Sequence, residues 1–116
     1  MNRSMTKDKE NTFGINERDY HTIQAITQKY AEVKEVQLFG SRAKGNFKFR
    51  IDIDFAVMDP NVSQKTMANL LYDFEESSLP YRVDLVNYYA LNHKNLIDHI
   101  DRVEIVIYGL NSKENL

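Results

Sequence analysis

The sequence predicts a small mixed α/β (α+β) fold, in which a small mixed β-sheet is flanked by helices. Two observations favour this class. Two kinds of segment alternate along the chain: segments with apolar residues at helical spacing, and short β-rich runs. One of these runs, residues 51–57, alternates strictly, as a half-buried strand does. The 116 residues have room for one domain, which we expect to span residues 1–116.

The first elements are expected to be a helix, a strand and a single helical turn. Apolar residues recur at helical spacing over 17–31, and Asn16 can cap the start of that helix. A β-rich strand over 35–39 follows and ends abruptly. Residues 41–44 then form one helical turn, which Gly45 terminates.

The next strand carries two carboxylates side by side. Asp52, Asp54 and Ala56 share one face, because side chains on a strand alternate between its two faces. The opposite, apolar face is formed by Ile51, Ile53, Phe55 and Val57. This segment therefore predicts a half-buried strand with an acidic outer face.

The second half of the chain continues the alternation of helices and strands. A helix is expected from Ser63 to about residue 76, a strand over 81–87, a helix over about 91–101 and a closing strand over 103–108. On the strand over 81–87, Asp84 lies on the polar face. It can therefore share a face with the earlier pair of aspartates.

Composition excludes several kinds of function. Fifteen Lys and Arg against 17 Asp and Glu give a net charge of −2, which provides no electrostatic footprint for a long nucleic acid. There is no cysteine, so no disulfide or thiolate site can form. No apolar run approaches a membrane span or a signal peptide, so we expect a soluble, cytoplasmic protein. The polar ends, about 1–14 and 111–116, are expected to be flexible tails.

Asp52, Asp54 and Asp84 are the residues that point to chemistry. Carboxylates this close repel each other unless a cation lies between them, and oxygen ligands on a rigid strand suit Mg²⁺ or Mn²⁺. An isolated Asp-x-Asp is more often the solvent face of a strand. Here Gly40 and Ser41 lie upstream, between a strand and a helical turn, where backbone N–H groups favour a phosphate. This context favours a metal and phosphate site.

The spacing of these residues resembles a known signature. Residues 38–57 contain Gly-Ser, ten residues and then Asp-x-Asp, and are similar to the motif of the DNA-polymerase-β-type nucleotidyltransferase superfamily. Residues 82–86, Arg-Val-Asp-Leu-Val, resemble the strand that carries the third carboxylate of that family. The resemblance implies a polymerase-β-like nucleotidyltransferase fold.

The resemblance also implies a role for each matching residue. Gly40 and Ser41 would hold the β- and γ-phosphates of the nucleotide, and Asp52 and Asp54 would bind the metal that accompanies them. Asp84 would join them at a second metal. Two Mg²⁺ ions would then support an in-line displacement at the α-phosphate of ATP by an acceptor hydroxyl, with pyrophosphate leaving.

The sequence gives weaker indications of a functional role for the remaining charged and titratable residues. Arg42 and Lys44 either neutralise the phosphates or are two exposed charges on a helical turn. His21, His93 and His99 have no metal-ligand spacing and are interpreted as surface residues.

The whole pattern resembles the stand-alone minimal nucleotidyltransferases (MNT) that pair with helical HEPN proteins. That resemblance implies an antitoxin that transfers AMP to a tyrosine of a HEPN ribonuclease toxin within a hetero-oligomer. Two alternatives remain open: transfer to a small molecule or an RNA end, and a binding antitoxin that neutralises its partner without catalysis.

Overall fold

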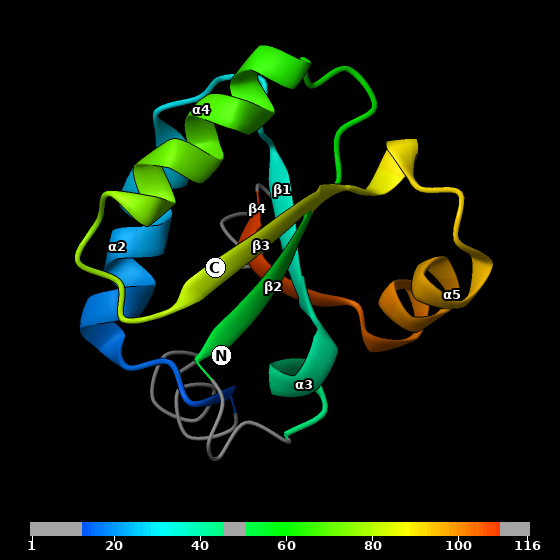
Figure 1. The fold of residues 1–116 in the computed structure, drawn as a ribbon, viewed down its shortest axis with the longest axis horizontal. Coiled ribbons are helices and arrows are strands. Elements are labelled where there is room, and N and C mark those ends of the chain that lie inside the picture. Colours follow the sequence, from blue (N-terminus) through cyan, green and yellow to red (C-terminus); the bar gives the residue numbers. More distant parts are fainter. Residues whose placement is uncertain (1–12, 46–50, 110–116) are drawn as a thin grey trace.

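Four strands form one mixed sheet with helices on both faces (Figure 1). The computed structural model describes residues 13–45 and 51–109. The strand order is β3-β2-β1-β4, which confirms the expected small mixed sheet. The strands are β1 (Glu35–Phe39), β2 (Asp52–Val57), β3 (Arg82–Asn87) and β4 (Ile105–Gly109).

The pairing of the strands determines where the acidic residues meet. β1 runs antiparallel to β2 and β4, whereas β2 and β3 are parallel. The register places Asp54 of β2 between Phe39 of β1 and Asp84 of β3. Asp52 pairs in the same register with Arg82.

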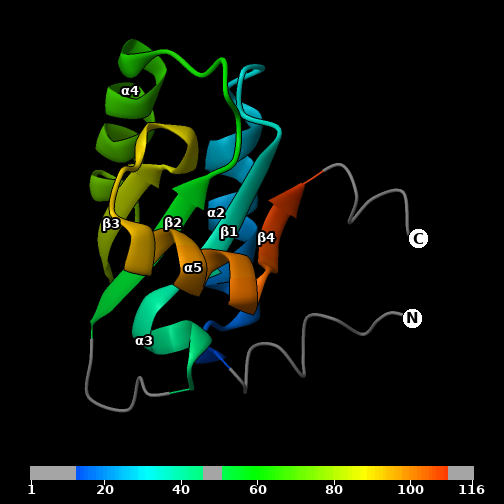
Figure 2. The same ribbon diagram turned by 90° about the vertical axis from the view of Figure 1, so that its right-hand side faces the viewer.

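Helices cover the two faces of the sheet differently. α2 (Glu17–Gln28) and α4 (Gln64–Glu75) contact each other and lie on one face, and α5 (Lys94–Val103) lies on the other (Figures 1 and 2). The short α3 (Gly40–Ala43) follows β1 directly, and a 3₁₀ turn, η1 (Tyr88–Ala90), follows β3. No helix in the described stretches is long and apolar enough to cross a membrane.

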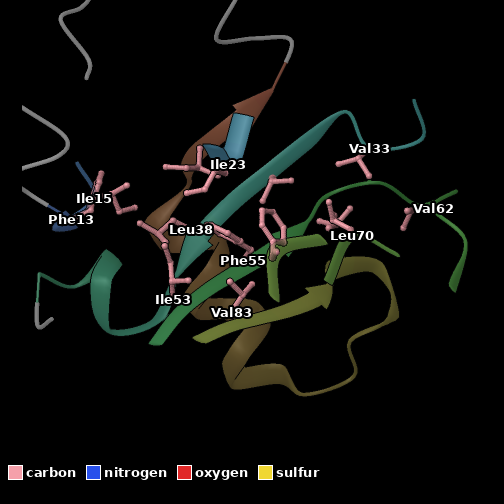
Figure 3. Close-up of a cluster of buried hydrophobic side chains, with 14 residues drawn as sticks. Phe13, Ile15, Ile23, Val33, Leu38, Ile53, Phe55, Val62, Leu70 and Val83 are labelled. Atoms are coloured by element: carbon pink, nitrogen blue, oxygen red, sulfur yellow. The ribbon is translucent and has the colours of Figure 1, made fainter. Parts of the chain in front are cut away.

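The larger core fills the space between the sheet and the α2–α4 layer (Figure 3). Phe55 of β2 and Phe74 of α4 lie at its centre, with ring centroids 5.5 Å apart. It also contains Phe13, Ile15, Ile23, Val33, Val36, Leu38, Ile53, Val57, Val62, Leu70, Val83 and Ile107. This core fixes β2, and with it the acidic face on the other side of the strand.

A smaller core lies under α5. Phe39, Ala56 and Ile100 are its buried members. Ala56 shares its face of β2 with the two aspartates and is covered by α5, whereas Asp52 and Asp54 are only partly buried among the described residues.

The order of helices and strands agrees with the sequence prediction, while several ends differ. The first helix stops at Gln28, three residues before the expected end. The last helix starts at Lys94 and includes Val103, which had been assigned to the closing strand. That strand starts at Ile105, because Glu104 adopts a left-handed conformation that ends the helix.

Two residues lie in surroundings that the sequence pattern did not predict. Ile51, expected on the apolar face with Ile53, is 57% exposed and precedes the first residue of β2. Phe13, assigned to a flexible tail, is buried in the main core and is only 7% exposed. The rest of the predicted tails, residues 1–12 and 110–116, lies outside the described residues.

Candidate active site

Asp54 is the centre of the acidic face. It projects from the middle of the sheet, and Asp84 lies beside it on the parallel neighbour β3. Asp54 is half-buried, whereas Asp84 is exposed. The sequence thus correctly placed these two carboxylates on one face, and the register makes them direct neighbours.

The protonation of Asp54 reflects these surroundings. Burial of the carboxyl raises its pKa, and the charge of Asp84, hydrogen bonding with Asp84 and the charge of Asp52 raise it further, to about 6. A raised pKa means that the negative charge on Asp54 is poorly compensated by the protein. A cation bound at this point would relieve that cost.

Asp52 lies two residues along the strand, on the same face as Asp54. Its carboxylate Oδ1 is 4.0 Å from Nε of the exposed Arg82. Its backbone oxygen accepts a hydrogen bond of 3.1 Å from Nε of Arg42. The side chain of Asp52 therefore faces a cation from the next strand, while its main chain is held from α3.

The donor chemistry of the three aspartates fits a hard divalent cation, since all the available ligand atoms are carboxylate oxygens. Within residues 13–45 and 51–109, however, no three acidic, histidine or cysteine side chains converge as a preformed metal cage. The aspartates share a face without meeting at one point.

Gly40 approaches the acidic face more closely than any other residue type could. Its φ of +80° is rarely adopted by residues with a side chain, and a Cβ atom placed there would lie 2.2 Å from Oδ2 of Asp54. Ser41 follows at the second position of α3. Its side chain makes no hydrogen bond within the described part of the chain. The turn from β1 into α3 thus lies against Asp54 at Gly40, and Ser41 is the next residue along it.

The position of Arg42 corrects the expectation of an exposed charge, whereas its role in neutralising phosphates stays a prediction. Arg42 is 4% exposed, and its Nη1 donates to the backbone oxygens of Phe13, at 2.8 Å, and Gly14, at 3.3 Å. Its guanidinium also stacks on the Tyr81 ring, 4.5 Å from the centroid. With its bond to the Asp52 oxygen, Arg42 joins the N-terminal segment to β2. It is a structural residue.

Lys44 and His99 both lie near the turn from β1 into α3. Lys44 is exposed, as one of the two interpretations held. His99, interpreted as a surface residue, instead accepts a hydrogen bond of 2.9 Å at Nε2 from the Gly40 N–H. Burial, and then the positive charges of Lys44 and Arg102, lower the pKa of His99. Sequence reasoning missed this contact, because it joins residues on separate elements.

Similarity to known proteins over most of the chain decides the family. Residues 21–113 match the family model described as polymerase beta, nucleotidyltransferase. This chain belongs to the polymerase beta nucleotidyltransferase family. The match includes α3, β2 and β3, and so the Gly-Ser and both acidic strands. The chain is accordingly a nucleotidyltransferase, with a nucleotide substrate and the divalent metal chemistry general to that family.

Individual relatives of this nucleotidyltransferase agree with that assignment. A probable protein adenylyltransferase, MntA, from Haemophilus influenzae is 32% identical over 98 residues, which cover 80% of this chain and 82% of the relative. One chain of the crystal structure of a toxin-antitoxin with AMP-PNP superposes with a TM-score of 0.62. It is 21% identical, with 84% of this chain and 78% of that chain covered, and so shows the fold alone.

Proposed function

We propose that this nucleotidyltransferase transfers AMP from ATP to a tyrosine hydroxyl of a HEPN-type toxin partner and thereby acts as its antitoxin. The observation that carries the chemistry is the pairing of Asp54 with Asp84 beside the Gly40 turn. The similarity to a probable protein adenylyltransferase supports AMP as the transferred group and a protein as the acceptor. The toxin-antitoxin structure with a similar fold supports a toxin as the partner.

In this proposal the three aspartates hold two Mg²⁺ ions. Asp52 and Asp54 would hold the ion that accompanies the triphosphate, and Asp84 would join them at the second ion. The bound ions would lower the pKa of the attacking hydroxyl and stabilise the charge that develops at the α-phosphate. The raised pKa of Asp54 supports a cation here, because the carboxylate lacks compensation without one.

The turn between β1 and α3 is proposed to bind the phosphates. Its Gly40 N–H already bonds to His99, so the contacts with phosphate oxygens fall to the Ser41 hydroxyl and the backbone beyond it. Gly40 contributes by allowing the turn to lie against Asp54. Lys44, which is exposed on the same turn, can supply positive charge to the leaving pyrophosphate.

The exposure of the aspartates supports a protein acceptor. The elements from α2 to β4 are all used to build the sheet and its two layers of helices. Among the described residues, Asp84 is exposed and the side chain of Asp52 is 40% exposed, so a hydroxyl carried by another protein can reach them. We therefore propose that the partner presents the hydroxyl to the aspartates of β2 and β3, in a hetero-oligomer.

The test uses ATP labelled at the α- or the γ-phosphate, with Mg²⁺ and a HEPN-type protein encoded next to this chain as the candidate partner. We expect the partner to acquire the α-label only, and the double variant Asp52→Asn/Asp54→Asn to abolish the transfer. Asp98→Asn is the matched control, because it changes a carboxylate that pairs with Lys94 on the outer side of α5. The control should transfer as the wild type does.

Other outcomes would overturn the proposal. Transfer of the γ-label would indicate a kinase, and no transfer to the partner would reject protein adenylylation. Neutralisation of the toxin by the double variant, with the partner still bound, would show that the chain acts by occlusion and not by catalysis.

A further inference from the structure

His99 connects α5 to the turn that carries Gly40 and Ser41. It lies on α5 three residues after Leu96 and one before Ile100, both of which pack toward the sheet. Its ring stands edge-on to Phe39, with centroids 6.2 Å apart. The imidazole is thus held between α5 and the end of β1.

The hydrogen bond from Gly40 to His99 satisfies a backbone group that would otherwise lack a partner. The first N–H groups of a helix have no acceptor within the helix, and Phe39, which precedes α3, contributes no side-chain cap. The Gly40 N–H donates instead to Nε2 of His99 at 2.9 Å. Because Nε2 accepts, the ring is neutral and carries its hydrogen on Nδ1.

Gly40 also lies close to the carboxylate of Asp54. A Cβ atom at Gly40 would lie 2.2 Å from Oδ2 and 2.9 Å from Cγ of the Asp54 carboxylate. The glycine and the carboxylate therefore limit each other's positions. A movement of Gly40 away from His99 changes the space available to the Asp54 side chain and redirects Ser41, the next residue.

We propose that His99 is a positioning residue for nucleotidyl transfer: its Nε2 atom holds the Gly40 turn against Asp54, which aligns the Ser41 hydroxyl with the carboxylates. The inference rests on the proposed function for its catalytic consequence. The hydrogen bond itself is independent of that function and can be measured without a nucleotide.

Two substitutions separate the acceptor atom from the ring. His99→Gln keeps an acceptor, since the Gln Oε1 lies the same number of bonds from Cβ as Nε2 does. His99→Leu has a similar volume and no acceptor. We expect His99→Leu to lower kcat/KM for MgATP by about tenfold or more, and His99→Gln to stay within about threefold of the wild type. His21→Leu, on the exposed side of α2, is the control for a surface histidine.

A spectroscopic measurement tests the contact directly. In the wild-type protein, a ¹⁵N–¹⁵N coupling through the hydrogen bond between the Gly40 amide and His99 Nε2 is expected. The Gly40 amide resonance should shift, and its hydrogen exchange accelerate, in His99→Leu but not in His21→Leu. Thermal unfolding of each variant checks that it is folded.

Several results would overturn the inference. Absence of the coupling in the folded wild type would remove its basis, as would a folded His99→Leu variant with wild-type kcat/KM and an unchanged Gly40 resonance. Equal losses in His99→Gln and His99→Leu would assign the effect to ring packing on Phe39. If the wild type transfers no AMP, the proposed function fails, and the coupling and the affinity for a non-hydrolysable MgATP analogue then decide the inference separately.

Discussion

At the scale of single residues, Gly40 has both a left-handed backbone conformation and a close approach to Asp54, and experiment can separate these two constraints. Both Gly40 and Gly45 have positive φ, +80° and +78°, but only Gly40 faces the Asp54 carboxylate. A Cβ atom at Gly45 would meet nothing within 4 Å. The two glycines therefore form a matched pair.

We expect Gly40→Ala to abolish most of the transfer activity, by about a hundredfold or more, because the turn must move away from Asp54. Gly45→Ala should keep the activity. Both substitutions should lower the free energy of unfolding by about 1–2 kcal/mol, the cost of a left-handed conformation for a residue with a side chain. Steady-state kinetics and denaturant unfolding measure the two effects. Equal loss of activity in both variants would contradict the contact.

The pKa of Asp54 predicts how stability depends on pH. Its value in the folded protein is about 6, against an ordinary value of 3.8, so the folded state binds the proton more tightly than the unfolded state. The contribution of Asp54 to the free energy of unfolding is therefore largest at acidic pH, and it falls as the pH rises from about 4 to about 6. Above that range the charged carboxylate destabilises the fold.

Asp54→Asn should accordingly raise the melting temperature of the metal-free protein at neutral pH, with little change near pH 4. Added Mg²⁺ should stabilise the wild type at neutral pH and have less effect on the variant, because ligands stabilise the state that binds them. Thermal unfolding across pH, with and without Mg²⁺, provides the measurement. Parallel curves for the two proteins would show that folding does not raise the pKa of Asp54.

At the scale of elements, Arg42 joins segments that are far apart in the sequence. We expect Arg42→Met to lower the free energy of unfolding by about 2–4 kcal/mol, because the backbone oxygens of Phe13 and Asp52 lose the hydrogen bonds that the guanidinium donates. Lys44→Met, on the same helical turn but exposed, should change it by less than about 0.5 kcal/mol.

Denaturant unfolding of the two variants measures the difference. The Arg42 variant should also bind Mg²⁺ and nucleotide more weakly, since the backbone at Asp52 loses one of its supports. Similar stability of the two variants would show that the bonds of Arg42 contribute little to the fold.

The elements also show which features a sequence can predict. The order of helices and strands, and the common face of Asp54 and Asp84, follow from local periodicity and were predicted correctly. The ends of elements were less predictable, because they depend on features such as the left-handed conformation of Glu104. The roles of Asp52, Asp54, Asp84 and Ser41 in catalysis stay predictions.

Contacts between distant segments could not be predicted from the sequence. The sequence presents Arg42 as a phosphate-binding or an exposed charge, because nothing in its neighbourhood indicates that Phe13 folds back onto it. His99 looked like a surface histidine for the same reason, since its partner Gly40 lies on another element. Ile51 fits the alternation of β2, yet lies before the strand begins and is exposed.

At the scale of the whole molecule, stability depends on the core between the sheet and the α2–α4 layer. Phe74 is buried there against Phe55, whereas Tyr72, on the same helix, is 61% exposed. We expect Phe74→Ala to lower the free energy of unfolding by about 3–5 kcal/mol. Tyr72→Ala should change it by less than about 0.5 kcal/mol.

Because a domain of this size has only about 5–15 kcal/mol of stability, the Phe74 variant should unfold at a clearly lower denaturant concentration. The transfer activity of the Phe74 variant, measured where it is still folded, tells whether the substitution lowers stability alone or also damages the candidate active site. A Tyr72 variant as unstable as the Phe74 variant would indicate that α4 packs in a different orientation.

The pairing of β4 with β1 has a consequence for synthesis on the ribosome. β1 is made early and β4 last, so β1 remains an edge strand while the chain between them is translated. An open edge can pair with strands of other nascent chains and so promote aggregation. The acidic strands β2 and β3 can pair before β4 emerges, since neither of them contacts it in the sheet. A ribosome that pauses before β4 would therefore display a nearly assembled acidic face on a chain that is still prone to aggregate.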